Sequence, residues 1–124
     1  MRIFASKAFH RFTRREAIDP EALVRAAREV VDGRWDADLG GGVFKQRIAR
    51  AGAGKSGGYR TILLFRVGSA VYFVHGFAKS DRANISRLEL VAFRRAADVL
   101  TTLSPTAVAA AIAAGELIEV TDEL

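Results

Sequence analysis

Two apolar stretches separated by a Gly-Ser pair occupy the middle of the chain. They read YRTILLFRV, residues 59–67, and AVYFVHGFA, residues 70–78, with Gly68 and Ser69 between them. β-Branched and aromatic residues favour strands, and a two-residue connection that contains glycine favours a tight hairpin. Both stretches are more continuously apolar than the other predicted strands. We therefore expect them to pair as central strands of a sheet.

Helices and further strands are predicted on both sides of this hairpin. Asp19 before Pro20 is typical of a helix start, and Gly33 is typical of a helix end. The predicted elements are a strand over residues 2–9, helices over 8–17 and 19–31, a strand over 43–49, the central hairpin, a helix from Asn84 or Ser86 to Thr101, an Ala-rich helix from Pro105 to Gly115, and a strand over 117–120. This order indicates one α+β domain.

Apolar spacing also predicts which side of two helices packs on the sheet. In the helix over 19–31 the predicted buried stripe is Leu23, Ala26, Ala27, Val30 and Val31. In the helix that ends at Thr101 it is Leu88, Val91, Ala92, Ala96 and Val99.

Length and composition indicate a soluble protein. The chain has 124 residues and is 50% hydrophobic, which is enough for one core without metals or disulfides. It has no cysteine, which suits a reducing cytoplasm. The start, MRIFASKAFHRF, lacks a secretory signal, and Arg66, His75 and glycines interrupt the longest apolar stretch. We therefore expect a cytoplasmic protein without a membrane partner.

Basic residues gather in the middle of the chain. The net charge is +5, and no acidic residue occurs between Asp38 and Asp81. A field of one sign attracts polyanions, of which nucleic acid is the commonest. The bases in this segment are Lys45, Arg47, Arg50, Lys55, Arg60, Arg66 and Lys79. The segment is predicted to bind phosphate groups, and a solvated basic surface is the alternative.

Residues 49–56 read ARAGAGKS and approximate a nucleotide-binding phosphate loop. The strict pattern begins with glycine, where this chain has Ala49, and a helix must follow the Ser or Thr. Here Gly57 and Gly58 follow, and then a strand-forming run. We therefore predict no nucleotide cofactor.

Three segments resemble the RelE/HigB-type toxins of bacterial toxin–antitoxin pairs: DLGGGVFKQRIAR, GKSGGYRTILLF and VYFVHGFAKSDRANIS. The ordered motifs are K-x-R, G-G-Y-R and F-x-K-x-x-x-x-N-I, and the resemblance covers about residues 1–100. It implies a RelE-like, microbial-ribonuclease-type α+β fold, with an N-terminal helical hairpin and a C-terminal helix on a mainly antiparallel sheet. It divides the chain into a toxin domain over 1–101 and a C-terminal helix and acidic tail over 102–124, which either belong to that domain or are appended to it.

The resemblance further implies a toxin that cuts messenger RNA at the ribosome without a metal and is silenced by a cognate antitoxin. By motif, Lys45 and Arg47 match the basic strand pair and Arg60 matches the arginine of G-G-Y-R, while Lys79 ends the last strand of the motif set. These four are the candidate catalytic residues. Arginine forks suit phosphate geometry, and crowding by other cations makes Lys45 or Lys79 a candidate base. An exposed Arg60 is expected to contribute little to stability.

Four further residues are candidate RNA contacts: Arg50, Lys55, Tyr59 and His75. Tyr59 either stacks on a base or packs in the core, and His75 is either a packed strand histidine or a proton-transfer group. No metal site is predicted, because the chain has only two histidines and no cysteine.

Two alternatives remain at this stage. ParE-like toxins share the fold but bind DNA gyrase without chemistry, and an inactive nucleic-acid-binding module is a further possibility.

The acidic tail from Glu116 to Glu123 is predicted to compete with the antitoxin for binding to the basic segment, because a tethered ligand has a high effective concentration.

Overall fold

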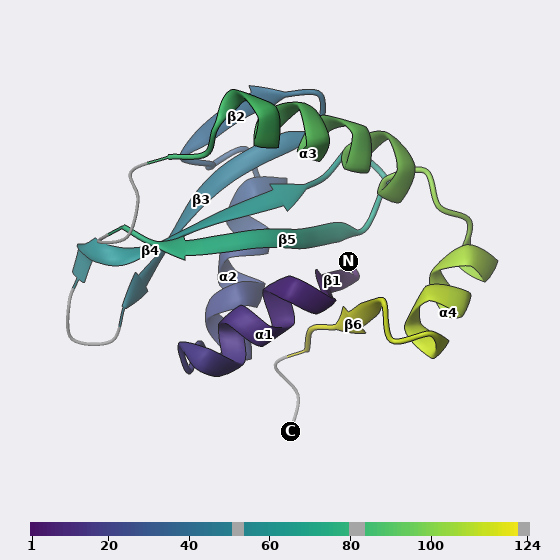
Figure 1. Ribbon diagram of the computed structural model, residues 1–124, viewed down its shortest axis with the longest axis horizontal. Helices are drawn as coiled ribbons and strands as arrows, with labels where there is room; N and C mark the ends of the chain where they lie inside the picture. The colour runs from purple at the N-terminus through teal and green to yellow at the C-terminus, as the bar shows by residue number, and fades with distance from the viewer. Residues whose placement is uncertain (51–53, 80–83, 122–124) are drawn as a thin grey trace.

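A computed structural model describes residues 1–50, 54–79 and 84–121, without the side chains of 50 and 54–57 (Figure 1). This part of the chain forms four helices and six strands. In order they are β1 (Ile3–Ser6), α1 (Lys7–Arg15), α2 (Pro20–Val31), β2 (Ala37–Gly40), β3 (Val43–Arg50), β4 (Gly54–Leu64), β5 (Val71–Ala78), α3 (Arg87–Leu100), α4 (Pro105–Ala113) and β6 (Leu117–Glu119). The predicted α+β class and RelE-like fold are confirmed.

The strands form one sheet in the order β2-β3-β4-β5-β1-β6. The β1–β5 pairing is parallel, and the other pairings are antiparallel. The predicted pairing is present as β4 and β5, near the centre of the sheet, but residues 65–70 connect the two strands in place of the predicted two-residue turn at Gly68 and Ser69. The first strand is shorter than predicted, because the Ser6 hydroxyl accepts a hydrogen bond from the Phe9 N–H at 3.1 Å and so caps α1. β2 was not predicted from the sequence.

Helices cover both faces of the sheet, so the chain has two apolar cores. On one face α1 and α2 bury Phe9, Phe12 and Leu23 against side chains such as Phe73 and Tyr59. On the other face α3 and α4 pack against a second set: Phe4, Val43, Ile62, Leu64 and Tyr72. Figure 1 shows α3 lying along the sheet above β3 and β4. Side chains that alternate along a strand therefore belong to different cores.

Of the buried stripe predicted for α3, only Ala96 packs on the sheet, and Leu88, Val91, Ala92 and Val99 are exposed. Leu88, Val91 and Val99 are 83%, 44% and 61% exposed. The side of the helix that packs against the sheet carries the buried Ala97 and the partly buried Leu90, Phe93, Ala96 and Leu100. Apolar residues occur on two sides of this helix, and sequence spacing alone does not tell which side the sheet takes.

Contacts with the β2–β3 turn help set the rotation of α3. The turn needs glycine, because Gly40, Gly41 and Gly42 all have positive φ. It also leaves no room for a side chain, since a Cβ on Gly41 would lie 2.9 Å from Cγ of Arg94. Arg94 in turn donates a hydrogen bond to the carbonyl oxygen of Leu39. The turn and the helix therefore fit together closely.

The C-terminal segment completes the far edge of the sheet. β6 pairs with β1, and Val108 and Leu117 are buried in the same core as Phe4. Hydrogen bonds from Arg2 lower the pKa of Glu119, and the two side chains pair at 3.0 Å. This edge is opposite to β2 and β3, so the described part of the acidic tail does not cover the basic strands; residues 122–124 lie outside the described chain.

Among the described residues no single helix has the length and apolar character needed to cross a membrane. Together α3 and α4 pass by length and composition, but they are bent by 116° at the break between them.

Gly58, the second glycine of the G-G-Y-R motif, is expected to be essential for stability. A Cβ there would lie 2.2 Å from the Ile48 carbonyl oxygen, and this backbone atom is fixed by the sheet. We expect Gly58→Ala to lower the free energy of unfolding by about 1–3 kcal/mol in urea titrations. Gly76→Ala is the comparison, and we expect it to lower the free energy of unfolding less than Gly58→Ala does. Its Cβ would lie 2.5 Å from a ring atom of Phe12, and a ring can shift whereas the sheet backbone cannot. Unchanged stability of Gly58→Ala would contradict this account.

Candidate functional site

Two of the predicted catalytic residues, Arg47 and Arg60, lie directly opposite each other on β3 and β4. Cross-strand partners share a face, so both side chains rise from the face that α3 covers in part. Lys45 lies two residues before Arg47 and opposite Ile62, which places it on the same face. The predicted alternation of β3 is therefore confirmed.

A carboxylate that sequence analysis did not identify lies between the two arginines. Arg47 donates from Nε to both Asp36 oxygens at 2.9 Å, and Arg60 donates from Nη1 to Oδ2 at 2.8 Å. The Asp36 and Arg60 side chains are only 18% and 15% exposed, whereas Arg47 is 43% exposed. These three residues are called the arginine cluster below. Two cations and one anion give it a formal charge of +1.

A buried glutamine fixes the backbone that carries Asp36. Oε1 of Gln46 accepts a hydrogen bond from the Asp36 N–H at 2.8 Å. Its Nε2 donates to the Arg34 carbonyl at 3.2 Å and to Glu29 Oε1 at 3.4 Å. Gln46 alternates with Arg47 on β3, so it points to the opposite face. The segment before β2 is therefore tied to α2 and β3 together, and the carboxylate has a defined position.

The role of Arg60 differs from the sequence-based expectation. The expectation was an exposed arginine of little importance to stability. Its side chain is mostly buried and ion-paired, so its removal leaves Asp36 with one partner fewer. Loss of this contact is costly because the mostly buried Asp36 carboxylate then keeps only its hydrogen bonds from Arg47.

His75 lies on the same face as Arg60, under the first half of α3. It is opposite Ile62, and its ring lies 5.5 Å from that of Phe93 and 5.7 Å from that of Phe77. Its Nε2 is 3.9 Å from Oε2 of Glu89, and its side chain is 29% exposed. Of the two roles left open for His75, a packed strand histidine fits these contacts.

The two candidate lysines are placed less tightly. Lys79 is exposed just beyond β5, and its N–H donates to the Gly58 carbonyl at 3.3 Å. Lys45 is partly buried. Within the described part of the chain neither lysine forms an ion pair. The structure thus brings Arg47 and Arg60 together through Asp36. Neither lysine ammonium group pairs with a carboxylate of the described residues.

Tyr59 does not lie with the arginines. It is 4% exposed, belongs to the core under α1 and α2, and meets the Phe12 ring edge-on at 5.6 Å. It alternates with Arg60 along β4 and so points to the opposite face. The stacking role is therefore wrong for Tyr59, and the core alternative is correct.

The remaining RNA-contact candidates, Arg50 and Lys55, have side chains outside the described residues. Their backbones lie in β3 and β4, and β4 runs on through Ser56. No helix follows Ser56, in agreement with the rejection of a phosphate loop.

The sequence did contain a signal for Asp36. Gly40, Gly41 and Gly42 turn the chain back, and the resulting hairpin pairs Ala37 with Lys45. Asp36 then lies next to the basic strand, since its N–H also donates to the Lys45 carbonyl at 3.2 Å. Asp36 lies just before the acid-free segment that begins after Asp38, so the charge pattern of that segment does not include it.

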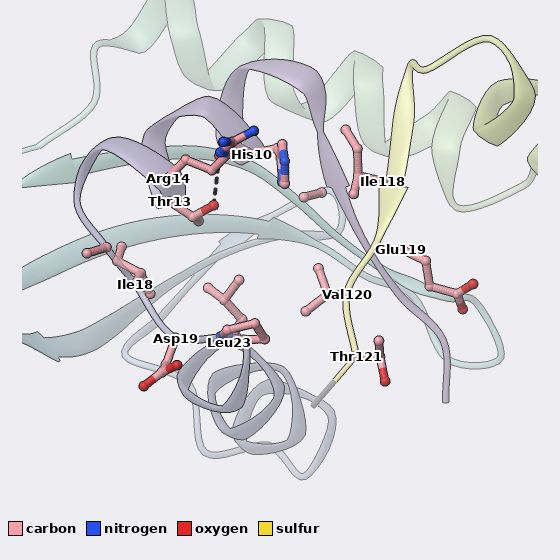
Figure 2. A pocket seen from close by; sticks show the side chains of 13 residues that line it. His10, Thr13, Arg14, Ile18, Asp19, Leu23, Ile118, Glu119, Val120 and Thr121 are labelled. Atoms are coloured by element: carbon pink, nitrogen blue, oxygen red, sulfur yellow. Dashed lines mark hydrogen bonds between the residues drawn. The ribbon is translucent and has the colours of Figure 1, made fainter. Parts of the chain in front are cut away.

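A separate cleft of about 530 Å³ opens between α1, α2 and β6 (Figure 2). Figure 2 shows side chains of both helices and of the C-terminal segment pointing toward it. Its lining includes His10, Arg14, Ile18, Leu23, Ile118 and Val120. It contains no member of the arginine cluster. Among the described residues there is also no group of three His, Asp or Glu side chains that could hold a metal ion.

Comparison with known families decides the relationship. The family described as the RelE toxin of the RelE / RelB toxin-antitoxin system matches residues 1–120. The chain belongs to this RelE toxin family. No curated protein matches the sequence. The match extends past residue 100, where the sequence resemblance had ended, and takes in α4 and β6. The protein is therefore a toxin of a toxin–antitoxin system, and membership of the RelE family implies an antitoxin partner.

A double-mutant cycle tests the arginine cluster. We expect Arg60→Ala to lower the free energy of unfolding by about 1–3 kcal/mol, because it leaves a mostly buried carboxylate with one partner fewer. Asp36→Ala combined with Arg60→Ala should be less destabilising than the sum of the two single changes. Urea unfolding of the four proteins measures this coupling. Additive effects would mean that the Asp36–Arg60 contact is not formed in solution.

Proposed function

We propose that this RelE-family toxin is a metal-independent endoribonuclease that cleaves messenger RNA on the ribosome, in the cytoplasm, and so arrests translation. The observation that carries the proposal is the convergence of Arg47 and Arg60 on one carboxylate oxygen. Guanidinium groups in this arrangement suit an oxyanion, and a phosphate presents the same kind of oxygen. Family membership supports the proposal at the level of the toxin class.

The arginine cluster retains donors for a phosphate while it binds Asp36. Each guanidinium has five N–H donors. The described contacts with Asp36 engage Nε of Arg47 and Nη1 of Arg60. Arg47 is also the more exposed of the two arginines, so its terminal nitrogens are the first to meet an incoming strand. Asp36 therefore orients both arginines and leaves a net positive charge for RNA.

Cleavage without a metal needs three contributions. A base removes the 2′-hydroxyl proton, the oxygen attacks phosphorus, and the bond to the 5′-oxygen breaks as that oxygen takes up a proton. Arg47 and Arg60 would stabilise the added negative charge on the pentavalent phosphorus. Lys45, on the same face, and Lys79, at the end of β5, are the proposed proton-transfer groups. The products are a 2′,3′-cyclic phosphate and a 5′-hydroxyl.

Mapping the 5′ ends of cellular RNA after induction tests this function. Wild-type protein should produce new 5′ ends within translated frames. Arg60→Lys keeps the charge that pairs with Asp36 but loses the planar fork, so we expect cleavage to fall about 100-fold. Arg28→Lys is the matched control, because Arg28 is exposed on α2, which packs on the other face of the sheet.

Two results would contradict the proposal. Growth arrest with DNA damage and no new RNA ends would indicate a gyrase inhibitor of the same fold. Full cleavage by Arg60→Lys, at a soluble level equal to wild type, would remove the arginine cluster from the active site.

A further inference from the structure

The outward side of α3 carries an apolar stripe. Leu88, Val91, Ala92, Arg95 and Val99 are all exposed, and their spacing places them on one side of the helix. These five residues are called the outer stripe below. At 1.5 Å per residue the stripe is about 16 Å long, or three helical turns.

A helix with apolar residues on two sides is expected to be covered on both. The inner side of α3 packs on the sheet through Phe93, Ala97 and Leu100. Of the seven large hydrophobic residues that are exposed in the described chain, three belong to the outer stripe. Isolated exposed residues are normal, but an aligned set on one helix is typical of an interaction surface.

The orientation of α3 is fixed, so the outer stripe cannot turn inward. Ser86 and Glu89 form a reciprocal capping box that determines where the helix begins. Further along, Arg94 binds the carbonyl of Leu39, and Asp98 pairs with Arg66 of the strand-connecting turn at 2.6 Å. Exposure of the stripe is therefore a property of the fold.

The charges beside the stripe indicate what covers it. Arg95 lies within the stripe and Arg87 at its start, and within the described residues neither forms an ion pair. A partner that buries Leu88 and Val91 must also satisfy these guanidinium groups, which calls for carboxylates beside apolar residues. The chain has a net charge of +5, and long-range attraction favours an acidic partner as well.

We propose that the outer stripe binds an amphipathic, acidic helical segment of the cognate antitoxin. The segment places apolar side chains on Leu88, Val91 and Val99 and carboxylates on Arg95 and Arg87. A second copy of this chain fits less well, because a two-fold contact through the stripe would bring Arg95 near its own counterpart. The RelE family supplies the antitoxin that such a surface needs.

The position of the stripe also relates binding to inhibition, and this step rests on the proposed function. Leu88 neighbours Glu89, whose carboxylate lies 3.9 Å from His75, and His75 shares its face of the sheet with Arg60. An antitoxin that runs along the stripe and continues past Leu88 therefore reaches the face that carries the arginine cluster. Docking on α3 would hold the inhibiting segment in place.

Titration of the full chain with its cognate antitoxin by calorimetry tests the proposal. Leu88→Asp and Val99→Asp place a carboxylate at either end of the stripe, and both sites are exposed enough to leave the fold intact. We expect each change to weaken binding at least tenfold, because it would bury an unpaired charge beside acidic residues of the partner. Val67→Asp is the control, since Val67 is 98% exposed in the turn after β4 and lies outside the stripe.

Co-expression gives a second readout. Cells that carry Leu88→Asp or Val99→Asp should stop growing despite the antitoxin, whereas the Val67→Asp control should be neutralised like wild type. Wild-type affinity of both stripe variants would overturn the proposal. So would a wild-type dimer that becomes monomeric with Leu88→Asp while antitoxin affinity is unchanged, since the stripe would then be a self-association surface. If affinity falls as expected but the wild-type protein cuts no RNA, the docking surface stands and the ribonuclease proposal fails.

Discussion

Two guanidinium groups face each other across β3 and β4, and the site depends on how the fold accommodates them. Like charges that lie directly opposite on neighbouring strands repel, at a cost of about 0.2–1 kcal/mol. Asp36 turns this repulsion into attraction by accepting from both Arg47 and Arg60. The β2–β3 hairpin places Asp36 beside the two arginines, and Gln46 accepts a hydrogen bond from the Asp36 N–H. A pair of cations that would otherwise separate is thereby kept at one place on the sheet.

The same hairpin links the site to α3. Its glycine turn fits under Arg94, and Arg66 connects the turn to Asp98 through the Gly41 carbonyl at 3.2 Å and the ion pair at 2.6 Å. The helix thus closes one end of the face on which the arginine cluster lies and keeps its own outer stripe in solvent. The β2–β3 turn therefore both positions the Asp36 carboxylate and helps keep the outer stripe of α3 exposed.

Sequence patterns predicted most of the architecture but little of the site's electrostatics. The hairpin of β4 and β5, the start of α2 at Pro20 and the alternation of β3 follow from local signals, which act over a few residues. The orientation of α3 does not follow from local signals, because apolar residues lie on two sides of the helix. Only contacts with the rest of the fold determine which side faces the sheet. Asp36 was missed because its partnership with Arg60 spans 24 residues and depends on a register that a turn of three glycines sets. Tyr59 was ambiguous for a related reason: an aromatic residue in a strand suits either face until the register is known.

In the proposed mechanism Arg47 and Arg60, oriented by Asp36, bind the phosphate at which RNA is cut. The most direct measurement is a structure of the toxin on a ribosome whose messenger RNA carries a 2′-O-methyl group at the cleavage position, so that the nucleophile is absent. We expect the scissile phosphate at hydrogen-bonding distance, about 3 Å, from both guanidinium groups, with Asp36 still bound to them. A scissile phosphate placed elsewhere, with the arginines bound to Asp36 alone, would contradict the proposed mechanism.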